Sequence, residues 1–444
     1  MRLVARQELG RSNTKAGSRC VATQQHPLII RVPPNPAEVC GTLAGHSSTL
    51  VHTAAPPTMN VVFLSPHFPP NWYRFAMGLR DVGATVLGIA DTGHDSLRPE
   101  LRAALSDYYR VDDLGDYDQL TRALGYFIHR HGRIDRLDSL NEHWLETEAA
   151  LRTDFNIPGI DRRGIGVIKR KSLMKNRFLA AGLKPARGRV CRTPRALRSL
   201  INQVGLPVVA KPDVGVGAAR TYKLETHEDI ERYLREKLPV DYIVEEYIYG
   251  EIMTYDGLVD RRGEVVFDSS LIYSTGVMES VNEQRDLYYW IPRRIPADVV
   301  SAGRQMAREF DLRERPFHFE LFRTPAGELI PLEVNMRPPG GLTVDMFNFA
   351  NDFDFYREWA NVVVHGRFDA TITRPFCCLY VSRRDNRRYA LAHEEVLREF
   401  GPMLVNESRM DSAFSAAIGD QGYLLRHPDL EPLMEAAQRI QAKA

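Results

Sequence analysis

The sequence lacks long apolar runs and carries almost no net charge. No stretch approaches the roughly 18 to 20 consecutive apolar residues that a membrane-spanning helix needs, so we expect no transmembrane segment. Lys and Arg number 58 against 57 Asp and Glu, which leaves a formal charge of +1. Because the charges balance, the composition gives no general reason to expect binding to nucleic acid or to a membrane, and any basic site must be local.

Cysteine is scarce and irregularly placed. The chain has five: Cys20, Cys40, Cys191, Cys377 and Cys378. Their positions do not follow the spacing of a metal site, and Cys377 and Cys378 would point to opposite faces of a strand. We therefore expect reduced thiols and a cytoplasmic location.

Two nucleotide-binding fingerprints are missing. No G-x-G-x-x-G follows the first predicted strand, which argues against a dinucleotide-binding dehydrogenase. The glycine-rich segment further along is not G-x-x-x-x-G-K-[ST], which disfavours the P-loop class.

A chain of 444 residues is too long for one ordinary core, so two to four domains are expected. Residues 1–58 are rich in Thr, Ser, Ala, Pro and His and lack sustained periodicity, which predicts a disordered leader or an artefact of start-codon choice before Met59. An organellar transit peptide is the alternative.

From Met59 the sequence alternates strand and helix patterns, which is typical of a doubly wound parallel sheet. The expected strands are 60–65, 85–89, 108–111 and 136–140, and the expected helices are 72–82 and 117–131. The loop 65–72 and the run Asn141–Glu142–His143 follow strand ends, where such sheets bind ligands. Helix capping is an equally good explanation of Asn141 and Glu142.

A strand that ends at Lys211 leads into a loop of small residues containing Gly215 and Gly217. Backbone N–H groups of such a loop can approach phosphate oxygens closely, and Lys211 adds a positive charge beside them. A plain glycine hairpin is the simpler alternative.

The stretch Arg315–Gly341 carries the main chemical pattern. Two alternating segments flank Ala326 and Gly327, and a hairpin closed there would place Glu320 opposite Glu333 and His318 opposite Asn335. The residues that would point to the other face, into the core, are Phe319, Leu321, Leu332 and Val334.

This arrangement groups two carboxylates and an amide on one face, a set that suits Mg²⁺, which takes oxygen ligands and completes its shell with water and phosphates. Arg337 supplies a fork of donors for phosphate oxygens. An edge hairpin with one wet face would also alternate in this way. The continuation Glu-Val-Asn-Met-Arg-Pro-Pro-Gly-Gly is unusual for mere solvation and favours the metal hypothesis.

With its E-x-N-x-R segment, an acid one strand earlier and a strand-Lys-Pro-glycine segment, the chain resembles the ATP-grasp superfamily, including the ATP-grasp domains of the carbamoyl-phosphate synthase large chain. The resemblance implies that Glu320, Glu333 and Asn335 hold Mg²⁺ on the ATP phosphates, with Lys211 and Arg337 as catalytic residues at the reacting phosphate. Lys171, eleven positions before Gly182, would also reach the phosphates. Lys175 and Arg177 are expected to be solvated.

The resemblance also assigns a hinge at residues 242–251. Glu245, Glu246 and Ile248 would bind the nucleotide, with backbone from Glu246 to Ile248 at the adenine edge. An acid after Gly250 would bind the ribose, but Ile252 stands at the expected place and Glu251 stands one position early. Glu251 is therefore assigned to the ribose only if the strand bulges locally. Arg285 and Asp345 are expected near the substrate, although a solvated loop is an equal alternative for Arg285.

The implied fold is a multidomain α/β and α+β chain: a pre-ATP-grasp Rossmann-like domain at 59–160, a two-subdomain ATP-grasp domain at 161–370 with a lid at about 185–245, and a small β-rich C-terminal subdomain at 371–444. The implied function is that of an ATP- and Mg²⁺-dependent ligase, with Mn²⁺ as a substitute metal. It would activate a small carboxylate as an acyl phosphate and transfer it to an amine, forming a C–N bond.

Two alternatives stay open. One is an enzyme that phosphorylates bicarbonate or carbamate, although the chain has one ATP-grasp set and no evident biotinylation segment. The other is a catalytically silent ATP-binding protein, for which the Ile252 departure is the best support. The expected partners are small molecules, with neither nucleic acid nor membrane. The sequence leaves the oligomeric state open, with a homodimer as the candidate because dimers are common among proteins that it resembles.

Overall fold

The computed structural model describes residues 58–215, 220–274, 276, 280 and 284–444. The predicted leader therefore lies almost wholly outside the described residues, as does Gly217. Within the described part of the chain, no helix is both long and apolar enough to cross a membrane.

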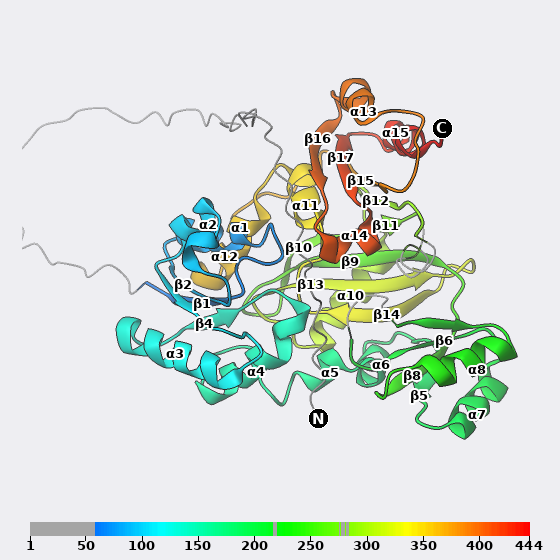
Figure 1. The fold of residues 1–444 in the computed structure, drawn as a ribbon, viewed down its shortest axis with the longest axis horizontal. Helices are drawn as coiled ribbons and strands as arrows, with labels where there is room; N and C mark the ends of the chain where they lie inside the picture. The colour runs from blue at the N-terminus through cyan, green and yellow to red at the C-terminus, as the bar shows by residue number, and fades with distance from the viewer. Residues whose placement is uncertain (1–57, 216–219, 275, 277–279, 281–283) are drawn as a thin grey trace, which may run out of the picture. The chain divides into compact units, whose positions relative to one another are not determined.

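The N-terminal region is a parallel sheet of four strands in the order β3-β2-β1-β4, of which Figure 1 labels β2, β1 and β4. Its elements are β1 (Asn60–Leu64), α1 (Tyr73–Asp81), β2 (Thr85–Ala90), η1 (His94–Ser96), α2 (Pro99–Ala104), β3 (Asp107–Arg110), α3 (Tyr117–His131), β4 (Arg136–Asp138), η2 (Glu142–Trp144) and α4 (Leu145–Asp154). The predicted doubly wound sheet is confirmed.

Alternation along β1 buries both faces of this sheet. Val62 and Leu64 belong to the core that includes Phe127 of α3. Phe63 faces the opposite side, where it contacts Trp359 with ring centroids 6.3 Å apart. Trp359 lies on α12 (Phe355–His365), so a helix from the far end of the chain covers one face of the N-terminal sheet.

A second, antiparallel sheet has the order β5-β8-β6-β7. It follows α5 (Gly166–Lys169) and α6 (Lys171–Ala180), and its elements are β5 (Gly188–Val190), α7 (Pro194–Val204), β6 (Val208–Pro212), β7 (Tyr222–Leu224), α8 (His227–Glu236) and β8 (Tyr242–Glu246). The helices α7 and α8 pack on it through one core. As predicted, α6 stops before Gly182, whose φ of +75° is easily adopted by glycine.

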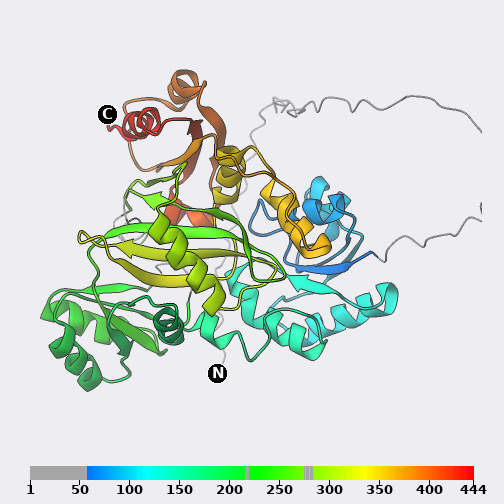
Figure 2. The same cartoon turned by 180° about the vertical axis from the view of Figure 1, so that it is seen from behind.

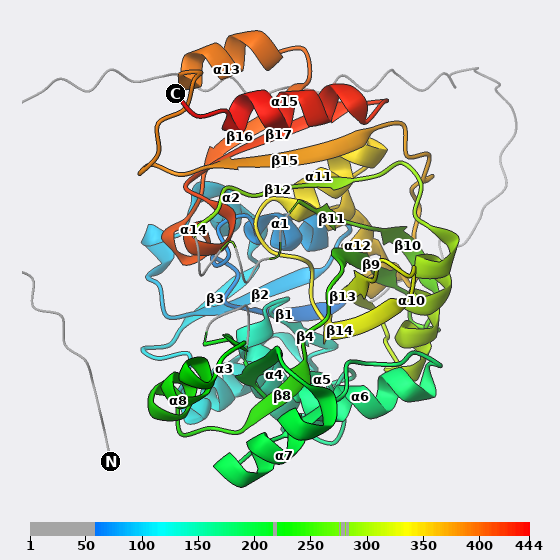
Figure 3. The ribbon, with the colours of Figure 1, turned by 90° about the vertical axis from the view of Figure 1, so that its right-hand side faces the viewer.

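The third sheet is the largest, with the strand order β14-β13-β9-β11-β12-β15-β17-β16 and β10 paired to β9. Its elements are β9 (Glu251–Val259), β10 (Val265–Ser269), β11 (Ile272–Tyr273), β12 (Tyr288–Ile291), α10 (Ala297–Glu309), β13 (Arg315–Arg323), β14 (Leu329–Asn335), α11 (Thr343–Asn351), β15 (Cys377–Arg383), α13 (His393–Phe400), β16 (Leu404–Arg409), α14 (Ser412–Ile418), β17 (Gln421–His427) and α15 (Glu431–Gln441). Figure 2 shows α10 lying across the strands β9 and β13, which it covers through a shared core. Figure 3 shows α13 and α15 beside β15 to β17, so the β-rich C-terminal part extends this sheet.

The predicted hairpin forms between β13 and β14. His318 lies opposite Asn335 and Glu320 opposite Glu333, which confirms the predicted register. Beyond Glu320 the register shifts, because Leu321 pairs with Pro331 and one residue of β14 is left over. The prediction that Leu332 is core is therefore wrong: Leu332 is half-buried, and Pro331 takes the buried place.

Candidate nucleotide site

The two hairpin acids face the same side of the large sheet, as residues directly opposite in an antiparallel pair must. Each has a cationic partner. Oε1 of Glu333 lies 2.9 Å from Nζ of Lys171, and Oε1 of Glu320 lies 3.2 Å from Nε2 of His318. The buried amide residue Asn335 follows two positions after Glu333 on the same face.

Lys171 joins the hairpin to the glycine-containing segment after β6. It begins α6 and is buried, and besides Glu333 its Nζ donates to the carbonyl oxygen of Gly215 at 3.1 Å. Its backbone N–H donates to the carbonyl of Asp213 at 3.0 Å, and the Asp213 carboxylate accepts from Ser172. The start of α6 therefore binds the segment from Asp213 to Gly215, which was predicted to approach phosphates. Through Lys171 it also contacts Glu333, a predicted metal ligand.

Lys211 lies in the same region. Its Nζ is 2.8 Å from Oε2 of Glu245 on the neighbouring strand β8. Burial alone would lower the pKa of Lys211, but the negative charges of Glu245, Glu333 and Glu320 outweigh burial and raise it. Because Lys171 contacts both Glu333 of the hairpin and the carbonyl of Gly215 after β6, the small sheet and the hairpin contribute to a single cluster.

Lys175 also pairs with Glu245 and donates to the carbonyl of Ala186, so the expectation that it is solvated is wrong. The signal was available, because Lys171 and Lys175 are four apart and lie on one face of α6. Burial would raise the pKa of Glu245, but Lys211 and Lys175 together lower it, so this acid is held as a carboxylate. Arg177 is exposed, as expected.

His318 is held as an imidazolium behind Glu320. Its Nδ1 lies 2.6 Å from Oδ1 of Asp256 on β9, and Asp256 also accepts from the Thr254 hydroxyl. Burial would lower the pKa of His318, but Asp256 and Glu320 raise it to about 9. Sequence reasoning missed Asp256, because its place opposite His318 depends on the pairing of β9 with β13.

Arg337 follows β14 and faces the N-terminal region. Its Nη1 donates to the carbonyl of Pro338 at 2.8 Å, and its Nε lies 4.0 Å from Oε2 of Glu142. The other carboxylate oxygen of Glu142 accepts from Lys169 at 2.8 Å. Burial would raise the pKa of Glu320, whereas His318, Arg337 and Lys211 lower it, which places Arg337 within electrostatic reach of the hairpin acids.

We call Lys171, Lys211, Glu245, Glu320, Glu333, Asn335 and Arg337 the carboxylate–lysine cluster. Two carboxylates and an amide oxygen fit a hard divalent cation that keeps water and phosphate in its remaining positions. Among the described residues, no three His, Cys, Asp or Glu side chains gather as a self-sufficient metal site. The donor set thus fits a metal that shares its shell with a ligand better than a structural metal held by protein alone.

Several polar groups of the predicted hinge already have partners within the chain. The Glu246 carboxylate is taken by Arg187, whose backbone N–H and Nε both donate to it at 2.7 Å. The backbone N–H groups of Glu246 and Tyr247 donate to the carbonyls of Arg187 and Pro207. Ile248 follows on the chain and is half-buried.

Glu251 is exposed at the start of β9, opposite Arg323, and it is not brought to the hairpin acids. The two candidate substrate residues also have partners within the chain. Asp345 is buried and accepts from Arg74 and from the Tyr356 hydroxyl at 3.2 Å. The carbonyl of Arg285 accepts from Arg384 at 3.1 Å.

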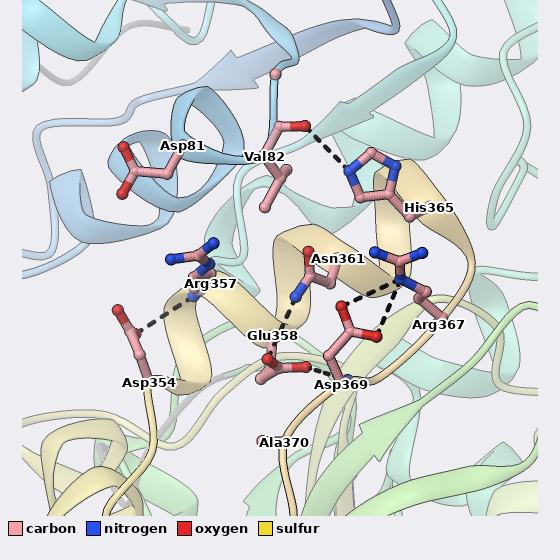
Figure 4. A pocket seen from close by; sticks show the side chains of 11 residues that line it. Asp81, Val82, Asp354, Arg357, Glu358, Asn361, His365, Arg367, Asp369 and Ala370 are labelled. Carbon is pink, nitrogen blue, oxygen red and sulfur yellow. Dashed lines mark hydrogen bonds and ion pairs between the residues drawn. The ribbon is translucent and has the colours of Figure 1, made fainter. Parts of the chain in front are cut away.

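A cavity of about 720 Å³ lies elsewhere, between the end of α1 and α12, and holds none of the predicted site residues (Figure 4). Its polar groups bind one another: Glu358 accepts from Asn361 at 3.2 Å and from the backbone of Asp369 at 2.7 Å, and His365 contacts the carbonyl of Val82. These satisfied groups give the cavity no chemistry comparable to that of the cluster.

Residues 204–345 match the family model described as the ATP-grasp domain. The L-arginine-specific L-amino acid ligase of Bacillus subtilis is 25% identical over 270 residues, which cover 58% of this chain and 64% of that protein. The match thus spans less than two thirds of this relative.

Solved structures share the fold at low identity. The L-amino acid ligase from Bacillus licheniformis superposes with a TM-score of 0.67 and 15% identity, covering 87% of this chain and 98% of that one. The ADP complex of N5-carboxyaminoimidazole ribonucleotide synthetase gives a TM-score of 0.66 and 13% identity, covering 87% and 96%. By its family match and by the fold it shares with these proteins, the chain carries an ATP-grasp domain.

Proposed function

We propose that this protein is an ATP-dependent ligase that joins two L-amino acids, activating the carboxylate of one as an acyl phosphate and transferring it to the amine of the other. The observation that carries the proposal is the convergence of the hairpin acids with the two lysines: Glu333 contacts Lys171, and Glu320, Glu333 and Glu245 together raise the pKa of Lys211. The two amino acid ligases among the similar proteins add the amino-acid substrate class.

The chemistry follows from the reactants. A carboxylate is a poor acyl donor because its oxygen is a poor leaving group. Transfer of the γ-phosphoryl group of ATP makes an acyl phosphate and ADP, and attack by the amine then forms the C–N bond and releases phosphate. The protein needs mainly to position the groups and offset charge, since these effects dominate phosphoryl transfer.

Each residue of the cluster has a role in this proposal. Glu320, Glu333 and Asn335 would hold Mg²⁺, or Mn²⁺ in its place, which when bound neutralises phosphate charge. Lys171, Lys211 and Arg337 would offset the remaining charge, and Glu245 keeps Lys211 in place. Backbone N–H groups near Gly215 and Gly217 would contact phosphates and exclude water.

The hinge completes the nucleotide site in this proposal. The backbone from Glu246 to Ile248 would contact the adenine, and Glu251 the ribose through a local adjustment of β9. Three further expectations stay with the proposal: a cytoplasmic location, a homodimeric assembly and the absence of nucleic-acid partners. The cysteines Cys191, Cys377 and Cys378, which are free and buried, agree with a reducing compartment.

The test is a screen of ADP release with MgATP and the twenty L-amino acids, singly and in pairs. We expect release that requires Mg²⁺ and amino acids, with an equal amount of dipeptide detected by mass spectrometry. ADP release that depends on bicarbonate without an amine would instead favour the bicarbonate-phosphorylating alternative. ATP binding with no turnover across the screen would favour the silent nucleotide-binding alternative.

A further inference from the structure

We propose that Arg315 is a positioning residue that fixes the end of β14, and with it Asn335 and Arg337, against the N-terminal sheet. The inference rests on the proposed function, because it assigns Arg315 a part in holding the metal and phosphate contacts of that site. Arg315 begins β13, three residues before His318, and is only 4% exposed.

One edge of the Arg315 guanidinium holds the backbone between the two site residues. Nε donates to the carbonyl of Met336 at 2.6 Å, in a buried environment. This bond fixes the peptide between Met336 and Arg337, from which the predicted phosphate contact extends, one residue after the predicted metal ligand Asn335. The side chain of Met336 is fully buried in the core that it shares with α10, so the side chain and the carbonyl of this residue are both held.

The other edge of Arg315 binds two acids of the N-terminal region. Nη2 lies 3.1 Å from Oε2 of Glu148 and 3.1 Å from Oδ1 of Asp138, the last residue of β4. Burial would raise the pKa of Glu148, but Arg152 and Arg315 lower it, so Glu148 stays charged. Burial and the neighbouring Glu148 raise the pKa of Asp138, although Arg315 and Arg152 oppose them. Two arginines and two acidic side chains then form a buried network in which each group has a partner.

Only a guanidinium can make these contacts together. Its planar fork presents donors on two edges at fixed angles, whereas a lysine ammonium is a single point on a flexible stem. Misplacement of a catalytic group by about 1 Å can cost roughly 100-fold in rate. The loop after β4 also carries Glu142, which lies 4.0 Å from Arg337, so the N-terminal sheet meets the end of β14 at two points.

The chain contains a matched control for this contact. Arg136 of β4 pairs with Glu314, one residue before Arg315, with its Nε and Nη2 donating at 2.8 Å and 3.1 Å. The Arg136–Glu314 pair also joins β4 to the start of β13 through a guanidinium and a carboxylate. Unlike Arg315, however, Arg136 makes no hydrogen bond with the end of β14 within the described part of the chain. R136K therefore measures the effect of weakening the contact between β4 and β13 alone. R315K measures that effect together with the loss of the bond to the Met336 carbonyl.

The experiment compares R315K, R136K and wild type by amino-acid-dependent ADP release and by calorimetric titration of ADP with and without Mg²⁺. We expect R315K to lower kcat about 10- to 100-fold and to weaken ADP binding in Mg²⁺ about 10-fold, with metal-free ADP affinity within about twofold of wild type. R136K should stay within about twofold in every measurement. Equal effects of R315K and R136K, or equal loss of ADP affinity with and without Mg²⁺, would overturn the inference.

Thermal unfolding establishes that each variant is folded. If R315K does not fold, D138N takes its place, because Arg315 then keeps Glu148 as a charged partner while a neutral amide replaces the carboxyl group of its second anchor. D138N should weaken Mg²⁺-dependent ADP binding about threefold, and unchanged binding would overturn the inference. E333Q separates the two claims: full turnover in E333Q counts against the proposed function, whereas an inactive E333Q with R315K equal to R136K counts against Arg315 alone.

Discussion

Glu333→Gln is expected to lower amino-acid-dependent ADP release at saturating MgATP at least about 1000-fold. The change keeps the shape of the side chain but removes one of two anionic metal ligands opposite each other in the hairpin. A bound metal contributes several kcal/mol of charge stabilisation to phosphoryl transfer, and about 1.4 kcal/mol corresponds to tenfold in rate. The loss also leaves Lys171 without its carboxylate partner.

The matched control for E333Q is E328Q, the same substitution at an exposed position in the turn of the same hairpin. E328Q should turn over within about twofold of wild type. Retention of more than about a tenth of wild-type turnover by a folded E333Q would remove Glu333 from the metal site.

Lys211→Met is expected to reduce the same activity about 100- to 1000-fold, the usual cost of removing one preorganised group that stabilises transition-state charge. Lys211 is buried, and the negative charges of Glu245, Glu333 and Glu320 all raise the pKa of its ammonium group. The variant should fold, because Glu245 keeps Lys175 as a partner. Measured by kcat and by the KM for ATP, the loss should appear mainly in kcat.

The same substitution at two other lysines, Lys175 and Lys184, provides the comparison for K211M. K175M removes a charge that pairs with Glu245 and with the carbonyl of Ala186, so its effect should be smaller, about tenfold. Lys184 is exposed, and K184M should behave as wild type. If K211M matched K184M, Lys211 would be a structural partner of Glu245 and nothing more.

The hairpin register was predictable because both of its determinants are local. Alternation with a period of two gives the faces, and the Ala326–Gly327 turn gives the pairing, with Gly327 at φ +85°. The misplacement of Leu332 follows from the register shift between Glu320 and Leu321, which leaves one residue of β14 unpaired. Pro331, beside it, lacks the N–H group that a strand ladder needs and is typical of such a bulge.

The grouping of the candidate site residues was predictable where it depends on a single segment. Lys211 stands at the end of a strand with glycine after it, and Glu333, Asn335 and Arg337 follow one another at fixed spacing. Asp256 and Arg315 were missed as site neighbours because their contacts join segments far apart in the sequence. Glu142 was placed at a ligand-binding strand end, but its approach to Arg337 was not predicted, for the same reason. The covering of the N-terminal sheet by α12 has the same nonlocal origin.

The central claim is that one cluster holds both metal and nucleotide, and a crystal structure of the protein with Mg²⁺ and ADP tests it most directly. The account predicts a metal about 2.0 to 2.1 Å from oxygens of Glu320, Glu333 and Asn335, the ligand distance of Mg²⁺, with the ADP phosphates beside Lys171 and Lys211. A nucleotide bound at the cavity between α1 and α12, or a metal without contact to any of the three hairpin residues, would contradict it.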